Sequence, residues 1–168
     1  MSDATVKIAI PGAGGRMGGM LIREIAAAED LQLVATTDRP DSPAIGEDAG
    51  LVAGLRENGV IIGDDPAALF DQADVVIDFS SPAARCAHAE LAAKSGVALV
   101  VGTTGLAPED EAVLERAGER VALVYCANTS VGVTLLGQIV EQAVGRQQDA
   151  VTWLRGGDHD AAVVRRVC

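Results

Sequence analysis

The sequence predicts an α/β fold built on a doubly wound parallel sheet. Short apolar runs alternate along the chain with longer segments of helical periodicity, and the connections between them are mostly short. Hydrophobic residues make up 49% of the chain and aromatic residues only 2%. The core must therefore be built from Val, Ile, Leu and Ala, which is typical of a parallel sheet covered by helices on both faces.

The first predicted unit is a strand, a helix and a second strand. Val6–Ile10 is a β-branched run that ends at Pro11-Gly12. Met17–Ala28 follows with apolar residues at helical spacing, and Leu31–Thr37 is the second strand. Residues 40–58 are polar and rich in Gly and Pro, so an irregular loop is expected there.

The middle of the chain predicts shorter elements. Val60–Ile62 is a candidate strand, Pro66–Phe70 a brief helix and Val75–Phe79 a further strand. Ser80-Ser81-Pro82 then places a capping residue and a proline at the start of a helix. That helix is expected to run to about Lys94 and to stop at Gly96.

The last predicted elements follow the same alternation. Val97–Val101 is a strand, and acidic residues after Pro108 favour the first turn of a helix. Val121–Tyr125 is a final strand, and Val133–Val144 a final helix. Strands that alternate with helices predict right-handed crossovers and ligand binding at the carboxyl ends of the strands.

Composition and charge argue against several classes of protein. The net charge of −11 opposes general nucleic-acid binding, which needs clustered Lys and Arg. Cys86, Cys126 and Cys168 are too few and too scattered for a disulfide framework or a zinc site. No signal peptide is evident, and no apolar stretch reaches the roughly 20 residues of a membrane span. We therefore expect a cytoplasmic protein with no membrane, nucleic-acid or metal partner.

A glycine-rich turn separates the first strand from the first helix. It comprises Gly12, Ala13, Gly14, Gly15, Arg16, Met17 and Gly18. Glycines there let the chain turn sharply and let backbone amides approach a pyrophosphate, and Gly18 would let the helix pack closely against the strand. Gly12, Gly15 and Gly18 lie at every third position, which is a variant of the usual glycine spacing. The turn predicts a Rossmann-like dinucleotide-binding domain.

An acidic residue ends the second strand, at the distance from the glycine turn that is expected in a dinucleotide-binding fold. Asp38 follows Gly18 by 20 residues, which suits a carboxylate that binds the adenine ribose hydroxyls. Arg39 follows at once, and a guanidinium there could bind a 2′-phosphate instead. The cofactor is thus NADH or NADPH, with both left open. The alternative is a solvated turn that only ends the strand.

Five segments in the same order carry a resemblance to a known family. They are Gly12 to Gly18, Gly46 to Gly50, Asp78 to Ser80, Gly102 to Gly105, and Ala127 to Gly132. Together they resemble the 4-hydroxy-tetrahydrodipicolinate reductase (dihydrodipicolinate reductase) family over about residues 5–146. The resemblance implies an oxidoreductase of lysine and diaminopimelate biosynthesis. Such an enzyme reduces a cyclic imine-like dicarboxylate with NADH or NADPH, and a homo-oligomer is expected.

The resemblance also implies which residues bind the cofactor. Gly12, Ala13, Gly14, Gly15, Arg16 and Met17 would line the pyrophosphate, and Asp38 and Arg39 would meet the adenosine end. The nicotinamide would lie beside Gly102, Thr103, Thr104, Cys126, Ala127, Asn128 and Thr129. No catalytic residue is assigned by the resemblance. From the residues alone, Asn128 could equally hold its own turn.

The resemblance stops near residue 146. Full-length members of the family continue into a substrate domain with a His-His-rich stretch, a nearby Lys and a Ser-Gly-Thr segment, and residues 147–168 contain none of these. We therefore predict a dinucleotide-binding domain at 1–146 and a divergent tail at 147–168, with the substrate domain missing or truncated. Our hypothesis for the divergent tail is that the reading frame is disrupted near residue 147. His159 receives no catalytic role, and His88 is expected to be structural or solvated.

The leading interpretation is a reductase of which this chain is a catalytically incomplete form. Two alternatives remain beside it. One is a dinucleotide-binding module without catalysis, or a defective copy of the reductase. The other is a doubly wound methyltransferase whose glycine loop binds S-adenosylmethionine, although the Gly102–Gly105 and Asn128 segments argue against it. Without the family's later elements, the last strand and helix are expected to expose apolar surface and to lower stability.

Overall fold

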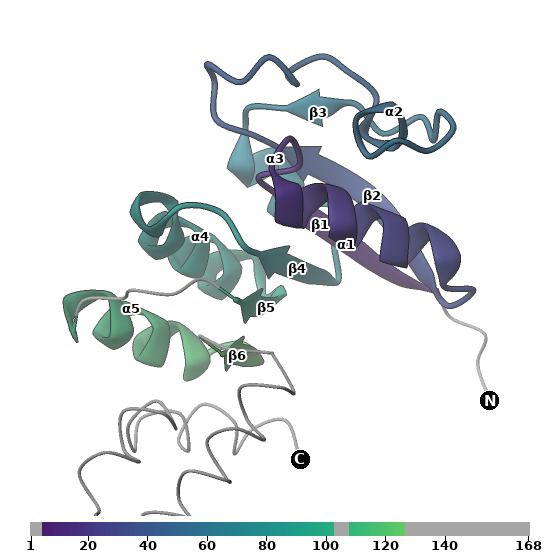
Figure 1. Cartoon of the computed structure of the whole chain (residues 1–168). Helices are drawn as coiled ribbons and strands as arrows, with labels where there is room; N and C mark the ends of the chain where they lie inside the picture. Colours follow the sequence, from purple (N-terminus) through teal and green to yellow (C-terminus); the bar gives the residue numbers. More distant parts are fainter. Residues whose placement is uncertain (1–4, 103–107, 127–168) are drawn as a thin grey trace, which may run out of the picture.

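The computed structural model describes residues 5–102 and 108–126, which form a six-stranded parallel sheet with helices on both faces (Figure 1). The strands are β1 (Val6–Pro11), β2 (Leu31–Thr37), β3 (Ile62–Gly63), β4 (Val75–Asp78), β5 (Ala98–Val101) and β6 (Leu123–Tyr125). The helices are α1 (Arg16–Ala27), α2 (Ala49–Val52), α3 (Pro66–Phe70), α4 (Pro82–Ser95) and α5 (Pro108–Gly118).

The strand order places the first strand in the middle of the sheet. The order is β3-β2-β1-β4-β5-β6, and every pair is parallel. On one side of β1, Val6 pairs with Leu31 of β2, and on the other side Ile8 pairs with Val75 of β4. The connections leave β1 and β4 toward opposite sides, so a crevice opens between their carboxyl ends. The doubly wound α/β fold is therefore confirmed.

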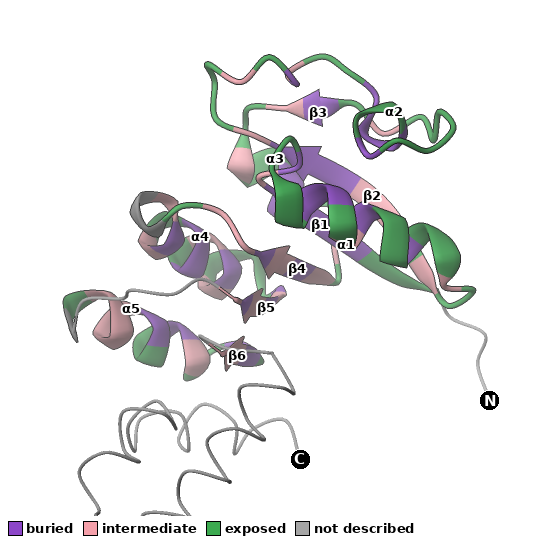
Figure 2. Cartoon of the chain, in the orientation of Figure 1, coloured by how far each residue is buried: buried purple, intermediate pink, exposed green. Residues whose placement is uncertain are grey.

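The sheet buries a separate hydrophobic cluster on each face. Ile8 and Ile10 of β1 pack with Ile22 of α1, and the intervening Ala9 points to the opposite cluster, because successive side chains alternate along a strand. The cluster around Ala9 also contains Leu114 of α5 and residues of α3 and α4. Figure 2 shows the buried residues on the strands and on the sheet-facing sides of the helices.

Most predicted elements are confirmed. The bounds of β2 and α3 are those that the sequence predicts, and the other strands begin or end within two residues of expectation. Helix α4 ends one residue beyond Lys94 and is followed by Gly96 in the left-handed conformation, with φ of 75°. Ser81 holds the N-cap position of α4, but its side chain makes no capping hydrogen bond within the described part of the chain.

The expectation of an irregular loop at 40–58 is wrong at its centre, where α2 forms. Asp48 starts this helix, because its carboxylate accepts a hydrogen bond from the Leu51 N–H at 3.1 Å. The same carboxylate also accepts hydrogen bonds from the backbone N–H groups of Asn58 and Gly59. One buried side chain thus closes the whole segment, and four residues are too few to show a helical period.

Within residues 5–102 and 108–126, no helix is long and apolar enough to cross a membrane. The helix predicted at Val133–Val144 and the tail predicted at 147–168 lie outside the described residues.

Candidate functional site

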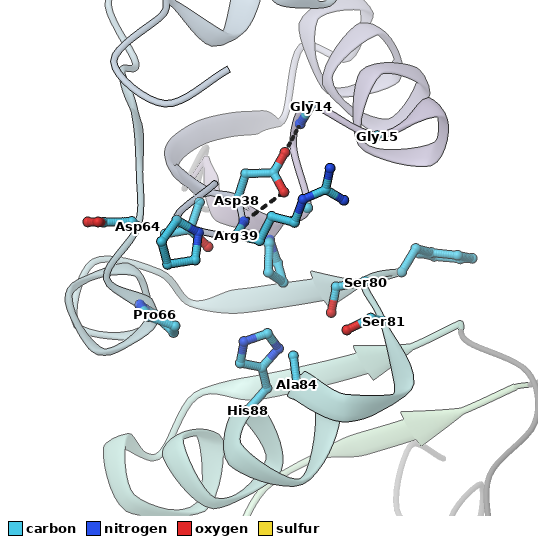
Figure 3. A pocket seen from close by; sticks show the side chains of 15 residues that line it. Gly14, Gly15, Asp38, Arg39, Asp64, Pro66, Ser80, Ser81, Ala84 and His88 are labelled. Atoms are coloured by element: carbon cyan, nitrogen blue, oxygen red, sulfur yellow. Dashed lines mark hydrogen bonds between the residues drawn. The ribbon is translucent and has the colours of Figure 1, made fainter. Parts of the chain in front are cut away.

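A cavity of about 610 Å³ lies at the carboxyl ends of β1, β2 and β4 (Figure 3). Its walls come from segments that are far apart in sequence. They are Pro11 with the glycine turn (Gly12, Gly14, Gly15), the end of β2 with its loop (Thr37, Asp38, Arg39, Pro40), Asp64 and Pro66, the end of β4 (Phe79, Ser80, Ser81), and Ala84 and His88 of α4. Its volume lies within the range of ordinary ligand pockets.

The glycine turn is held open by backbone hydrogen bonds to the neighbouring strand. The N–H groups of Gly12 and Ala13 both donate to the Thr37 carbonyl, at 2.7 and 3.0 Å. Gly12 has a φ of 77°, a conformation that glycine adopts without strain. Helix α1 begins directly afterwards at Arg16, and its N-cap Gly15 has no side chain to cap the first turn. The first N–H groups of the helix are therefore available to an anion.

Gly18 lets α1 approach the turn closely. A Cβ atom at this position would lie 2.3 Å from the Gly12 carbonyl oxygen and 2.7 Å from Ala13 Cα. Both are backbone atoms of the glycine turn, so they cannot move without changing the site. The glycine is expected from the sequence pattern, and the structure shows that the contact is with the turn itself.

Asp38 is fixed in place by three hydrogen bonds. Its Oδ2 accepts hydrogen bonds from the Gly14 N–H at 2.9 Å and from the Ser42 hydroxyl at 3.1 Å. Its Oδ1 accepts one from the Arg39 N–H at 2.8 Å. Figure 3 shows the carboxylate between the loop after β2 and the glycine turn. A carboxylate has about four acceptor positions, so this one keeps room for a further donor.

Arg39 extends over the cavity from the same loop (Figure 3). Its Nε lies 2.9 Å from Oδ1 of Asp41, and the two side chains are 71% and 80% exposed. Such an exposed ion pair is weak, so the guanidinium can move toward a ligand.

A buried aspartate–histidine pair adjoins the cavity, and its histidine, His88, lines the cavity wall. Oδ2 of Asp78, at the end of β4, lies 2.7 Å from Nδ1 of His88 in α4, and both side chains are buried. The Ser80 N–H donates to the other oxygen of Asp78 at 2.7 Å. Burial raises the pKa of Asp78, but the hydrogen bond and the charge of His88 and the hydrogen bonds from Ser80 outweigh it, so the pKa lies below its ordinary value.

Sequence reasoning did not find this pair. It left His88 as structural or solvated, and the structure shows a buried side chain that lines the cavity. The sequence does carry a signal for the burial of His88, because Arg85, His88, Ala89 and Ala92 recur at helical spacing and all four are buried. Because Arg85 and His88 are polar, this face of the helix does not show an apolar pattern in the sequence.

The structure brings together part of the predicted cofactor site. Gly12, Gly14, Gly15, Asp38 and Arg39 line the cavity, whereas Ala13 is buried beside it in a hydrophobic cluster. Arg16 and Met17 are exposed in the first turn of α1.

Gly102 and Cys126 follow β5 and β6 at the same edge of the sheet as the cavity. The Gly102 N–H donates to the Asp78 carbonyl, and the Cys126 N–H donates to the Val101 carbonyl, both at 3.0 Å. The Phe79 ring covers Gly102, since a Cβ there would lie 2.1 Å from Phe79 Cζ. Thr103, Thr104, Ala127, Asn128 and Thr129 lie outside the described residues.

The cysteine of α4 has a local structural contact. The Cys86 thiol donates a hydrogen bond to Asp110 of α5 at 3.2 Å, and this bond, burial and the charge of Asp110 raise the pKa of the thiol. In the described ranges, no three His, Cys, Asp or Glu side chains gather where they could hold a metal ion.

Comparisons with known proteins point to one family. The sequence profile described as "Dihydrodipicolinate reductase, N-terminus" matches residues 6–129. A 4-hydroxy-tetrahydrodipicolinate reductase from Burkholderia multivorans is 49% identical over 138 residues, which are 82% of this chain and 52% of the relative. One from Rhizobium rhizogenes is 46% identical over 143 residues, 85% of this chain and 52% of the relative. The chain thus spans about half the length of the curated relatives that it matches.

Solved structures show the same fold at lower identity. A dipicolinate-bound dihydrodipicolinate reductase from Paenisporosarcina sp. TG-14 superposes with a TM-score of 0.66 and 22% identity, covering 83% of this chain and 54% of that one. The WlbA dehydrogenase from Bordetella pertussis, in complex with NADH and UDP-GlcNAcA, gives a TM-score of 0.61 and 18% identity, covering 83% and 42%.

Proposed function

The chain belongs to the dihydrodipicolinate reductase family, and we propose that residues 5–126 are the greater part of the nucleotide-binding domain of an NAD(P)H-dependent reductase. One observation carries this proposal. The cavity joins a helix N-terminus without a side-chain cap, a fixed carboxylate and a guanidinium at the carboxyl edge of a parallel sheet. These are the groups that bind a pyrophosphate, a ribose and an adenine.

Each end of the cofactor has its own residues in this proposal. The backbone from Gly12 to Met17 binds the pyrophosphate, because Gly12, Gly14 and Gly15 line the cavity directly before the uncapped first turn of α1. Asp38 accepts hydrogen bonds from the ribose hydroxyls, and Arg39 lies over the adenine, with Ala84 and His88 on the other side of the cavity. The residues fit the cofactor because Gly14 leaves room for the Asp38 carboxylate, which a Cβ at Gly14 would meet at 2.4 Å.

The nicotinamide end is assigned to the neighbouring strand ends. Gly102, Thr103, Thr104, Cys126, Ala127, Asn128 and Thr129 bind it. Gly102 and Cys126 support this assignment because they follow β5 and β6, whose carboxyl ends lie at the edge where the cavity opens.

The proposed reaction is the reduction of 4-hydroxy-tetrahydrodipicolinate in lysine and diaminopimelate biosynthesis. When bound, the nicotinamide would supply the hydride for this reduction and would itself be oxidised to NAD(P)⁺. The residues of this chain orient the cofactor, and no proton donor is assigned among them. We expect the whole reductase to act in the cytoplasm as a homo-oligomer.

Cofactor titration tests the proposal directly. We expect NADH to bind the full chain saturably, with a change in its fluorescence, and S-adenosylmethionine not to displace it. Asp38→Ala should weaken NADH binding by about tenfold, since the variant loses a hydrogen bond between a charged acceptor and the ribose. Ser42→Ala is the matched control, because it removes a donor to Asp38 but no group that meets the cofactor. Absence of saturable NADH and NADPH binding would contradict the proposal.

Turnover separates the two remaining candidates. Oxidation of NADH that depends on the imine substrate would support the reductase. Cofactor binding without turnover would favour the dinucleotide-binding module, and the family relationship would then describe descent alone.

A further inference from the structure

We infer that the cofactor site prefers NADH to NADPH, an inference that rests on the proposed function and specifies its cofactor. The two cofactors differ only at the adenine ribose, where a 2′-hydroxyl is replaced by a phosphate that carries a charge of about −1.5 to −2 at pH 7. The choice therefore depends on which groups surround that position.

Asp38 is arranged to accept a hydrogen bond there and not to tolerate an anion. Its two oxygens already accept hydrogen bonds from Gly14, Ser42 and Arg39, which keep the carboxylate in one orientation at the rim of the cavity. A ribose 2′-hydroxyl can donate to the remaining acceptor position. A 2′-phosphate is mostly deprotonated at pH 7, so it rarely has a proton to donate and would place two anions side by side.

The only cation on the wall of the cavity in the described residues, leaving His88 aside, is Arg39, and it is already matched by acids. Its Nε pairs with Asp41 at 2.9 Å, and Asp64 lines the same cavity. The carboxylates of Asp38 and Asp41 thus lie in the same loop as this guanidinium, and Asp64 adds a further negative charge to the cavity lining. The exposed Arg39–Asp41 pair contributes little attraction of its own. Its importance is that Asp41 brings a further negative charge to the group that would have to bind the phosphate.

Like charges at short range oppose binding, and this opposition weakens with salt. We expect the Kd for NADPH to exceed that for NADH by about tenfold or more at low ionic strength. The ratio of the two Kd values should fall as salt is added, because Arg39, Asp41 and Asp64 are exposed.

The experiment titrates NADH and NADPH against the full chain, followed by cofactor fluorescence at low and at moderate salt. Asp41→Asn removes one carboxylate and releases Arg39, so NADPH should bind about threefold more tightly while NADH changes by less than about twofold. The matched control is Glu24→Gln. It changes the net charge of the chain by the same amount from an exposed position on α1, and it should leave the ratio unchanged.

The outcomes distinguish this inference from the function on which it rests. The inference is supported if NADH binds more tightly than NADPH and if the ratio of the two Kd values falls in Asp41→Asn and at higher salt. Equal affinities, or tighter binding of NADPH, would overturn the preference and leave the proposed function standing. A preference for NADH that Asp41→Asn does not narrow would overturn the role of the local charges. If neither cofactor binds, the proposed function fails and the inference fails with it.

Discussion

Gly18 determines how closely α1 can approach the turn after β1. The Gly18→Ala variant should lose about 1–3 kcal/mol of unfolding free energy, because its methyl group would overlap backbone atoms of Gly12 and Ala13. NADH binding should weaken in the same variant, since the turn must shift. Urea denaturation and cofactor titration measure the two effects.

The adjacent glycine supplies the control. A Cβ at Gly19 would meet only Arg23 Nη1 at 3.6 Å and Ala53 Cα at 4.0 Å, which are ordinary contacts. Gly19→Ala should therefore be neutral or slightly stabilising, because alanine favours the helix. Equal losses in the two variants would show that helix α1 does not pack as described.

The buried carboxyl of Asp78 should make stability depend on pH at the acid end. Its pKa is lower in the folded protein than the ordinary value of 3.8. A carboxyl with a lowered folded pKa stabilises the fold at pH values above its unfolded pKa, and this contribution is lost as the pH falls through the folded pKa.

We therefore expect the unfolding free energy of the natural chain to decrease as the pH falls below about 4. The Asp78→Asn variant should be less stable at neutral pH and should lose less stability on acidification. Denaturant titrations at several pH values measure this difference. Parallel pH curves for the two proteins would show that Asp78 is not the titrating group.

Sequence patterns predicted the part of the candidate site that lies in the first strand, helix and strand of the chain. The glycine turn, Asp38 and Arg39 could be located because the spacing from Gly18 to Asp38 is set by one helix and one strand. The pairing of Asp78 with His88 could not be predicted in the same way. It depends on the angle at which α4 leaves β4, which no residue pattern specifies.

The C-terminus of α4 offers a direct test of how single residues end helices. Gly96 has a φ of 75°, and apart from Gly96 itself and its chain neighbours no atom of the described residues lies within 4 Å of the place where its Cβ would stand. Gly96→Ala should therefore cost about 1 kcal/mol through backbone strain alone. Gly96→Asn should cost less, because asparagine tolerates this conformation better. Thermal denaturation of the two variants gives the comparison, and an alanine variant as stable as the natural chain would contradict it.

Element prediction succeeded where a pattern repeated and failed where one contact decided the structure. The bounds of β2 and α3 are those predicted, and the structure adds that Asp65 caps α3 directly before Pro66. Helix α2 was missed because it depends on hydrogen bonds from Leu51, Asn58 and Gly59 to Asp48, across a segment without periodicity. This segment can be recognised as folded only when Asp48 is known to contact Asn58 and Gly59, and the sequence does not show that contact.

Ligand binding should stabilise the whole chain. A ligand that binds only the folded state at 100 times its Kd adds about 2.7 kcal/mol, which for a chain of this size raises the Tm by several degrees. Millimolar NADH should produce such a shift in the natural chain and a smaller one in Asp38→Ala. Differential scanning fluorimetry measures both, and a Tm that NADH does not change would contradict the proposed site.

The central position of β1 also affects how the protein is made. The first strand has two edges, and β2 covers one of them early, whereas the other waits for β4, whose Val75 pairs with Ile8. At the usual pace of translation, about 5–20 residues per second, this second edge remains uncovered on the ribosome for several seconds. Unpaired strand edges attract other chains. We therefore expect the nascent chain to be most prone to association with other chains after its first strand pair has formed and before β4 emerges.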